Sequence, residues 1–136
     1  MITSLEEYVS LVEHDDNDVR RNAVSEEANA ITWHAILENR PDLASEVAMN
    51  KKLPAEIVDR LIATGCSRTK SLVAMKRALS YEQFQKLAGD KDESVRAMIA
   101  KNKKAPTAIL MQLIEDETEI VSEAAKLQRS NRGDMS

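Results

Sequence analysis

The stretch AMNKKLP at residues 48–54 recurs as AKNKKAP at residues 100–106, with five of the seven positions identical. The two copies lie 52 residues apart, which is twice 26. A degraded copy, AMKRALS, occupies residues 74–80, midway between them. Self-similarity at a fixed period of this length is typical of repeat proteins, in which each repeat forms one small structural unit. The sequence therefore predicts a repeat with a period near 26 residues.

Apolar positions follow the same step, as in the series Leu61, Leu87 and Leu113. Between the first two repeats the step shortens to 24 residues. We therefore expect one domain over residues 1–130, followed by a polar C-terminal tail at 131–136. The predicted repeats occupy residues 4–30, 31–53, 54–79, 80–105 and 106–130.

The fourth repeat predicts two short helices. Ser80 to Gln83 forms a capping box at the start of the first helix, and Gly89 is expected to end it in the left-handed conformation. Acidic and hydroxyl residues from Asp90 to Ser94 then mark the start of the second helix. Pro106 is expected as the first residue of the next helix.

Composition agrees with an all-α fold, because the chain has 3% aromatic residues, three glycines and three prolines. A helix pair this short cannot bury its apolar side alone and must stack on its neighbours. The predicted fold is a short right-handed α-solenoid of about five two-helix repeats.

Several residues of the fourth repeat resemble the leucine-rich repeat variant family, a relative of the HEAT-like α-solenoids. They are Asp90, Val95, Arg96, Ala100, Asn102 and Pro106. Three other repeats depart from the Val-Arg pair of this pattern, with Leu43-Ala44, Thr69-Lys70 and Val121-Ser122. The resemblance implies a helical-repeat fold. Some proteins with such repeats carry a cysteine-rich metal cluster, but this chain lacks those cysteines, so we expect no metal.

Catalytic and cofactor chemistry has little support in the sequence. His14 and His34 lie in different repeats, and neither has a second histidine or a cysteine at metal-ligand spacing. Three glycines cannot build a phosphate-binding loop. Cys66 would be a reactive thiol if Arg68 lowered its pKa, but no histidine is suitably placed to act as its base. We expect no catalytic residues, no cofactor and no enzyme activity.

The amino terminus is acidic and lacks the basic and apolar pattern of a secretory signal, and no apolar run approaches the length of a membrane span. A single cysteine excludes an internal disulfide. We expect a cytoplasmic monomer that does not bind membranes.

Charges segregate between the two kinds of turn. Turns from first to second helix are acidic, and turns from second helix to the next repeat are basic, for example at Lys51-Lys52, Lys76-Arg77 and Lys103-Lys104. Only the first turn of this second kind, with Glu26-Glu27, breaks the pattern. Helix dipoles explain part of this pattern, but the acids of the last two turns exceed what capping requires. These predicted partner-binding residues are Asp90, Asp92, Glu93, Glu115, Asp116, Glu117 and Glu119.

The leading hypothesis is a non-catalytic module that binds a protein with a basic surface, for example a bacterial immunity or antitoxin-type protein that neutralises a basic toxin. The net charge of −4 makes nucleic acid a less favoured partner. The alternative is a nucleic-acid-binding repeat protein that uses the basic turns together with Arg20, Arg21, Lys70 and Arg96. Arg96 could instead pair with an aspartate of a neighbouring repeat.

Overall fold

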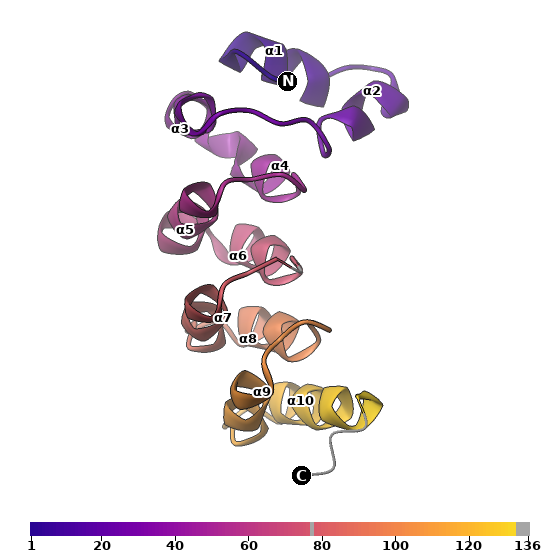
Figure 1. The fold of residues 1–136 in the computed structure, drawn as a ribbon, viewed down its shortest axis with the longest axis vertical. Coiled ribbons are helices and arrows are strands. Elements are labelled where there is room, and N and C mark those ends of the chain that lie inside the picture. The colour runs from indigo at the N-terminus through magenta and orange to yellow at the C-terminus, as the bar shows by residue number, and fades with distance from the viewer. Residues whose placement is uncertain (77, 133–136) are drawn as a thin grey trace. The chain divides into compact units, whose positions relative to one another are not determined.

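The structure is a computed structural model that describes residues 1–76 and 78–132. Within this part of the chain it contains ten α-helices, one 3-10 helix and no strand, which confirms the all-α prediction (Figure 1). Arg77 of the predicted basic turns and residues 133–136 of the predicted tail lie outside the described residues. The chain divides into two compact units, an N-terminal unit of residues 1–65 and a C-terminal unit of residues 66–136. The division falls inside the predicted repeat 54–79.

The N-terminal unit packs around two aromatic rings. Tyr8 meets the buried Trp33 edge-on, with ring centroids 5.4 Å apart and planes at 78°. Helix α1 packs on its neighbour α2 and on α3, and α3 packs on α5. A parallel β-bridge between Ile2 and Ala28 holds the first residues of the chain against the segment before α3. The elements are α1 (Leu5–Val12), α2 (Asn17–Asn22), α3 (Ala30–Asn39), the 3-10 helix η1 (Pro41–Leu43), α4 (Ala44–Ala48) and α5 (Ala55–Thr64).

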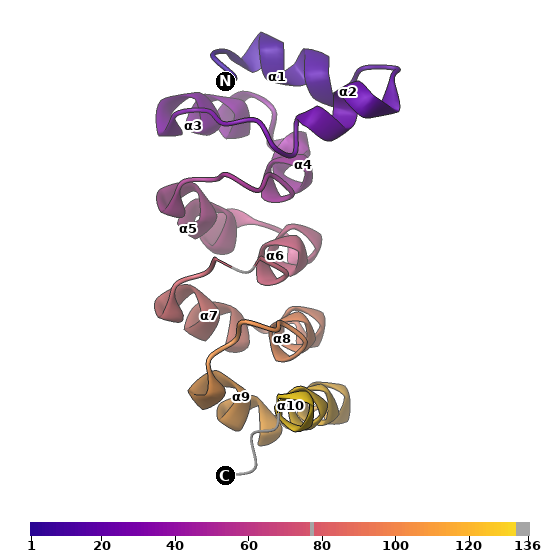
Figure 2. The ribbon, with the colours of Figure 1, turned by 45° about the vertical axis from the view of Figure 1, so that its right-hand side comes forward.

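The C-terminal unit consists of two rows of helices. Helix α8 packs beside both α6 and α10, which form one row, and α7 packs beside α9, which form the other. The two rows pack on each other, since α7 contacts α8 and α9 contacts α10 (Figure 2). Buried apolar residues such as Leu87, Val95 and Leu110 lie between the rows. The helices are α6 (Ser67–Ala74), α7 (Tyr81–Ala88), α8 (Glu93–Ala100), α9 (Thr107–Ile114) and α10 (Glu119–Asn131).

Helix starts largely follow the sequence signals. The predicted capping box is present, because Ser80 accepts from the Gln83 amide and the Gln83 side chain accepts from the Ser80 amide. Pro106 was predicted as the first residue of a helix, but it is the N-cap of α9, one position before the first helical residue. It has an extended ψ of 146°, which suits a cap. Helix α10 also continues to Asn131, one residue into the predicted tail.

The prediction for Gly89 was wrong. Its backbone has φ −99° and ψ 9°, so it is not left-handed. The Gly89 amide still ends α7, because it donates to the carbonyls of Gln85 and Lys86. This 3-10-like closure satisfies the last carbonyls of the helix without a left-handed residue.

We predict that Gly89→Ala is neutral or stabilises the protein by about 0.4–1 kcal/mol, because alanine restricts the unfolded chain and tolerates this conformation. A Cβ at Gly89 would meet its nearest atoms, the Gln85 and Lys86 carbonyl oxygens, at ordinary distances of 3.7 and 3.8 Å. Urea denaturation measures the change. A clear loss of stability would indicate that residue 89 needs the left-handed region after all.

Leu87→Ala should lower the free energy of unfolding by roughly 2–5 kcal/mol, because Leu87 is fully buried between the two helix rows and its loss leaves a cavity. Met111→Ala is the matched control, since Met111 on α9 is 48% exposed. Chemical denaturation followed by circular dichroism compares them. Equal midpoints for the two variants would contradict the packing described for α7.

Candidate functional site

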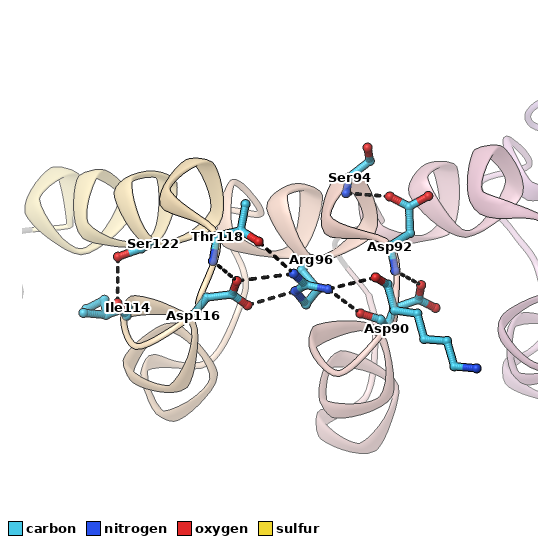
Figure 3. Close-up of polar contacts among 9 residues, drawn as sticks. Asp90, Asp92, Ser94, Arg96, Ile114, Asp116, Thr118 and Ser122 are labelled. Carbon is cyan, nitrogen blue, oxygen red and sulfur yellow. Dashed lines mark hydrogen bonds and ion pairs between the residues drawn. The ribbon is translucent and has the colours of Figure 1, made fainter.

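Two of the seven predicted partner-binding residues lie in internal ion pairs. Lys70 Nζ on α6 lies 2.7 Å from Asp90 Oδ2, in the turn before α8. Arg96 Nε on α8 lies 2.9 Å from Asp116 Oδ2, in the turn before α10 (Figure 3). The side chains of Asp90 and Asp116 are only 12% and 10% exposed. Each pair therefore ties one helix of the α6, α8 and α10 row to the turn that precedes the next helix of that row.

Arg96 joins three segments of the C-terminal unit. Its guanidinium donates to both carboxylate oxygens of Asp116 and to the Thr118 hydroxyl. It also donates to the backbone carbonyls of Asp90 and Lys91, at 2.8 and 3.1 Å. A planar fork of donors suits this combination of carboxylate and carbonyl acceptors. The side chain is 11% exposed and thus has little surface left for a partner.

The environment of Asp116 favours its charged form. Burial alone would raise the pKa of this carboxyl group, but the Thr118 amide and the Arg96 guanidinium outweigh burial, and the net effect is a lowered pKa. The Thr118 amide donates to Asp116 Oδ1 over 2.9 Å. Asp116 is therefore a structural carboxylate that closes the turn and neutralises Arg96.

Asp92 also has a structural role. It is the N-cap of α8, where its carboxylate accepts from the Ser94 amide at 2.7 Å (Figure 3). Hydrogen bonds from the Ser67 side chain and the Ser94 amide lower the pKa of Asp92. Loss of such a cap typically costs about 1 kcal/mol.

The remaining four predicted residues are exposed glutamates. Within the described part of the chain they make no ion pair. Glu93 and Glu119 are the first residues of α8 and α10, where a negative charge favours the helix dipole. Glu115 instead follows the last residue of α9, where a negative charge opposes the dipole, and Glu117 lies in the turn. Helix stability thus accounts for Glu93 and Glu119 but not for Glu115 and Glu117.

The four helix residues of the alternative hypothesis each have an acceptor within the chain. Lys70 and Arg96 form ion pairs with Asp90 and Asp116. Arg20 donates to the His14 carbonyl, and Arg21 pairs with Asp18 at 3.3 Å. The exposed cations of the basic turns include Lys51, Lys52, Lys103 and Lys104.

Two asparagines of the repeated stretch bind backbone groups, a role that the residue pattern alone did not predict. The Asn102 side-chain amide donates to the carbonyls of Ala74 and Lys76, and its oxygen accepts from the Lys104 amide, all at 2.8 Å. Asn50 makes the equivalent bonds to Ala23, Glu26 and Lys52. Both asparagines are buried. Their signal was an asparagine shared by the two well-matched copies of the stretch, whereas the degraded copy has Lys76 at that position.

The histidines and the cysteine each have their own local partners. His14 Nδ1 accepts from the Asp16 amide, and His34 Nδ1 lies 2.8 Å from a guanidinium nitrogen of Arg60. The exposed Cys66 is the N-cap of α6, and hydrogen bonds from the Thr69 amide and hydroxyl are the main causes that lower its thiol pKa. Among the described residues, no cluster of three or more histidine, cysteine or acidic side chains could hold a metal ion.

Comparison with known proteins adds no relative, since no family model, no curated protein and no solved structure matches this chain. Over residues 1–76 and 78–132, none of the helices is both long enough and apolar enough to cross a membrane. The candidate site therefore rests on the geometry alone. Its members are the four exposed glutamates Glu93, Glu115, Glu117 and Glu119.

Asp116→Asn should lower the free energy of unfolding at pH 7 by roughly 3 kcal/mol, because it leaves the Arg96 charge buried without its carboxylate. The pH dependence has a defined sign. A carboxyl group whose pKa is lowered by folding stabilises the native state above its unfolded pKa, near 4, and that stabilisation is lost as the pH falls through the folded pKa.

Urea midpoints of the wild type should therefore fall steeply below about pH 4, and Asp116→Asn should show a shallower fall. Glu117→Gln, at the adjacent residue that faces solvent, is the control and should keep the wild-type midpoint at pH 7. A variant at Asp116 that is as stable as this control would mean that the ion pair contributes nothing.

Proposed function

We propose that this chain is a non-catalytic protein-binding module built as a short right-handed α-solenoid of about five two-helix repeats. Support comes from polar contacts that recur at the 26-residue step. The pairs Lys70 with Asp90 and Arg96 with Asp116 are one step apart, and Asn50 and Asn102 are two steps apart. Stacked helix pairs of this kind expose extended surfaces, which commonly serve to bind other macromolecules.

The observation that carries the proposed binding surface is the placement of Glu115 and Glu117. A carboxylate at the end of α9 costs helix stability, by about 0.3–1 kcal/mol at an exposed site. Residues that reduce stability without a local benefit are expected where they serve binding. Together with Glu93 and Glu119 they give the C-terminal unit an acidic edge, defined here as these four glutamates.

An acidic edge of this kind favours a partner with a basic surface, because complementary charge speeds the encounter of two proteins. A cytoplasmic immunity or antitoxin-type protein that neutralises a basic toxin is our specific hypothesis. Nucleic acid is disfavoured, since Lys70 and Arg96 are occupied and the exposed edge is negative.

The test reverses the two glutamates that have no helix-stabilising role, in the variant Glu115→Lys with Glu117→Lys. The immobilised wild-type chain first captures its partner from lysate of its own cells, and mass spectrometry identifies the retained protein. Association of that purified partner is then followed at low and high salt. We expect the variant to associate at least about tenfold more slowly at low salt, because exposed charges act mainly on the encounter rate.

The matched control is Glu56→Lys with Glu82→Lys, which makes the same change in net charge at exposed residues of α5 and α7. It should associate within twofold of the wild type. Equal slowing in both variants would reduce the effect to net charge and reject the acidic edge. Capture of nucleic acid, with tighter binding by the lysine variant, would reject the proposed partner class.

A further inference from the structure

A second surface of the C-terminal unit is largely apolar. It lies on one flank of the α6, α8 and α10 row and carries three residues from each helix or its C-cap. Met75, Ile120 and Leu127 are 57%, 63% and 62% exposed. We define this apolar flank by its nine residues, which are Arg68, Leu72, Met75, Ser94, Met98, Lys101, Ile120, Ala124 and Leu127.

The helical register places these residues side by side. Each set of three recurs at the 26-residue step, as in Leu72, Met98 and Ala124. Helix α8 packs against both α6 and α10 (Figure 2), so equivalent positions on the three helices are neighbours across the row. The half-buried Leu72, Met98 and Ala124 border the more exposed Met75 and Leu127. The result is a continuous apolar stripe that crosses three helices.

Charge on the apolar flank is opposite in sign to that of the whole chain. Its two charged members, Arg68 and Lys101, are both cations and both exposed, whereas the chain has a net charge of −4. Lys103 and Lys104 follow in the next turn and are also exposed. Glu123 lies one turn from Ile120 and Leu127 on α10, and its carboxylate pairs with Lys126 at 3.7 Å. The flank therefore combines exposed apolar side chains with two exposed cations.

We propose that the apolar flank binds an acidic amphipathic helix of a partner protein. Its apolar residues suit the non-polar face of such a helix, and its lysines and arginine suit the acidic positions beside that face. Packed helices are spaced by about 8–10 Å, and two turns of a bound helix advance about 10.8 Å. A helix of about 15 residues with apolar side chains at every third or fourth position thus reaches all three helices of the row.

Phosphate chemistry fits this surface less well. Six of the nine residues are apolar, and Arg68 and Lys101 are the only cations among them. A nucleic acid would cover exposed methionine, isoleucine and leucine without an apolar counterpart, and two cations would neutralise little of its phosphate charge. The inference needs neither Glu115 nor Glu117, so it goes beyond the proposed function and can fail independently of it.

The probes are three fluorescein-labelled 15-residue peptides. The first has leucine at positions 1, 4, 8, 11 and 15 with glutamate and alanine elsewhere, the second replaces glutamate by lysine, and the third scrambles the first. Fluorescence anisotropy is measured on the full chain. We expect the acidic amphipathic peptide to bind at least tenfold more tightly than the other two.

The variant Ile120→Asp with Leu127→Asp should weaken this binding at least tenfold. The matched control is Ile31→Asp with Met111→Asp, which changes residues that are 80% and 48% exposed outside the apolar flank, and it should bind within twofold of the wild type. Circular dichroism verifies the helix content of each variant. Lys101→Glu is a second variant, at an exposed cation, and should also weaken binding of the acidic peptide and flatten its salt dependence.

Three results would overturn the proposal. The first is no binding of the acidic peptide at 100 µM chain, or binding that the scrambled peptide equals. The second is tighter binding of the basic peptide or of a 15-nucleotide single-stranded DNA. The third is a dimer of the wild-type chain in sedimentation equilibrium that the Ile120→Asp and Leu127→Asp variant abolishes, because the flank would then be covered by a second copy.

Discussion

The ion pair between Arg96 and Asp116 is the interaction around which the C-terminal unit is organised. The helices of this unit are short, and a helix of eight residues such as α8 is not stable by itself in water. Apolar packing between the two rows supplies most of the stabilisation, but it does not specify where each turn lies. Arg96 does so, because its fork of donors is satisfied only when the Asp90 carbonyl and the Asp116 carboxylate are both in place.

A second set of polar contacts acts on the opposite turns. Asn102 donates to the carbonyls of Ala74 and Lys76, at the end of α6 and just beyond it. Arg132 donates to the carbonyls of Asn102, Lys103 and Ala105. These carbonyls stand at helix ends and in turns, where no helical partner is available to them. Buried polar groups that lack partners are costly. The asparagine and arginine side chains therefore allow irregular backbone to lie close to the core.

The sequence predicted the elements of this fold better than the roles of its charges. Helical periodicity, few turn residues and the capping box at Ser80 were sufficient for the all-α class. The left-handed Gly89 was wrong, because a 3-10-like closure ends α7 equally well and leaves no trace in residue type. Periodicity locates helices, whereas the conformation of a single closing residue depends on how the next turn packs.

The same limit applies to the candidate site. Asp90 and Glu117 are both acids in polar turns, but only Asp90 has a cation 20 residues earlier that packing brings within 2.7 Å. Pairing of Arg96 with an aspartate of a neighbouring repeat was one hypothesis from the sequence, as an alternative to a role in nucleic-acid binding. The sequence could not divide the seven acids into three with structural roles and four that face solvent, because that division depends on which flank of each helix is covered.

The polar contacts of Arg96, Asn102 and Arg132 all join residues that are close together along the chain. Arg96 reaches a residue 20 positions away, Asn102 reaches back 28 positions to Ala74, and Arg132 reaches back 30 positions to Asn102. The entropy lost on closing a loop grows only with the logarithm of its length, and none of these loops is long. Chains dominated by such local contacts have low contact order and fold in microseconds to milliseconds. Each pair of neighbouring helices can thus form soon after its residues leave the ribosome, without waiting for a distant part of the sequence.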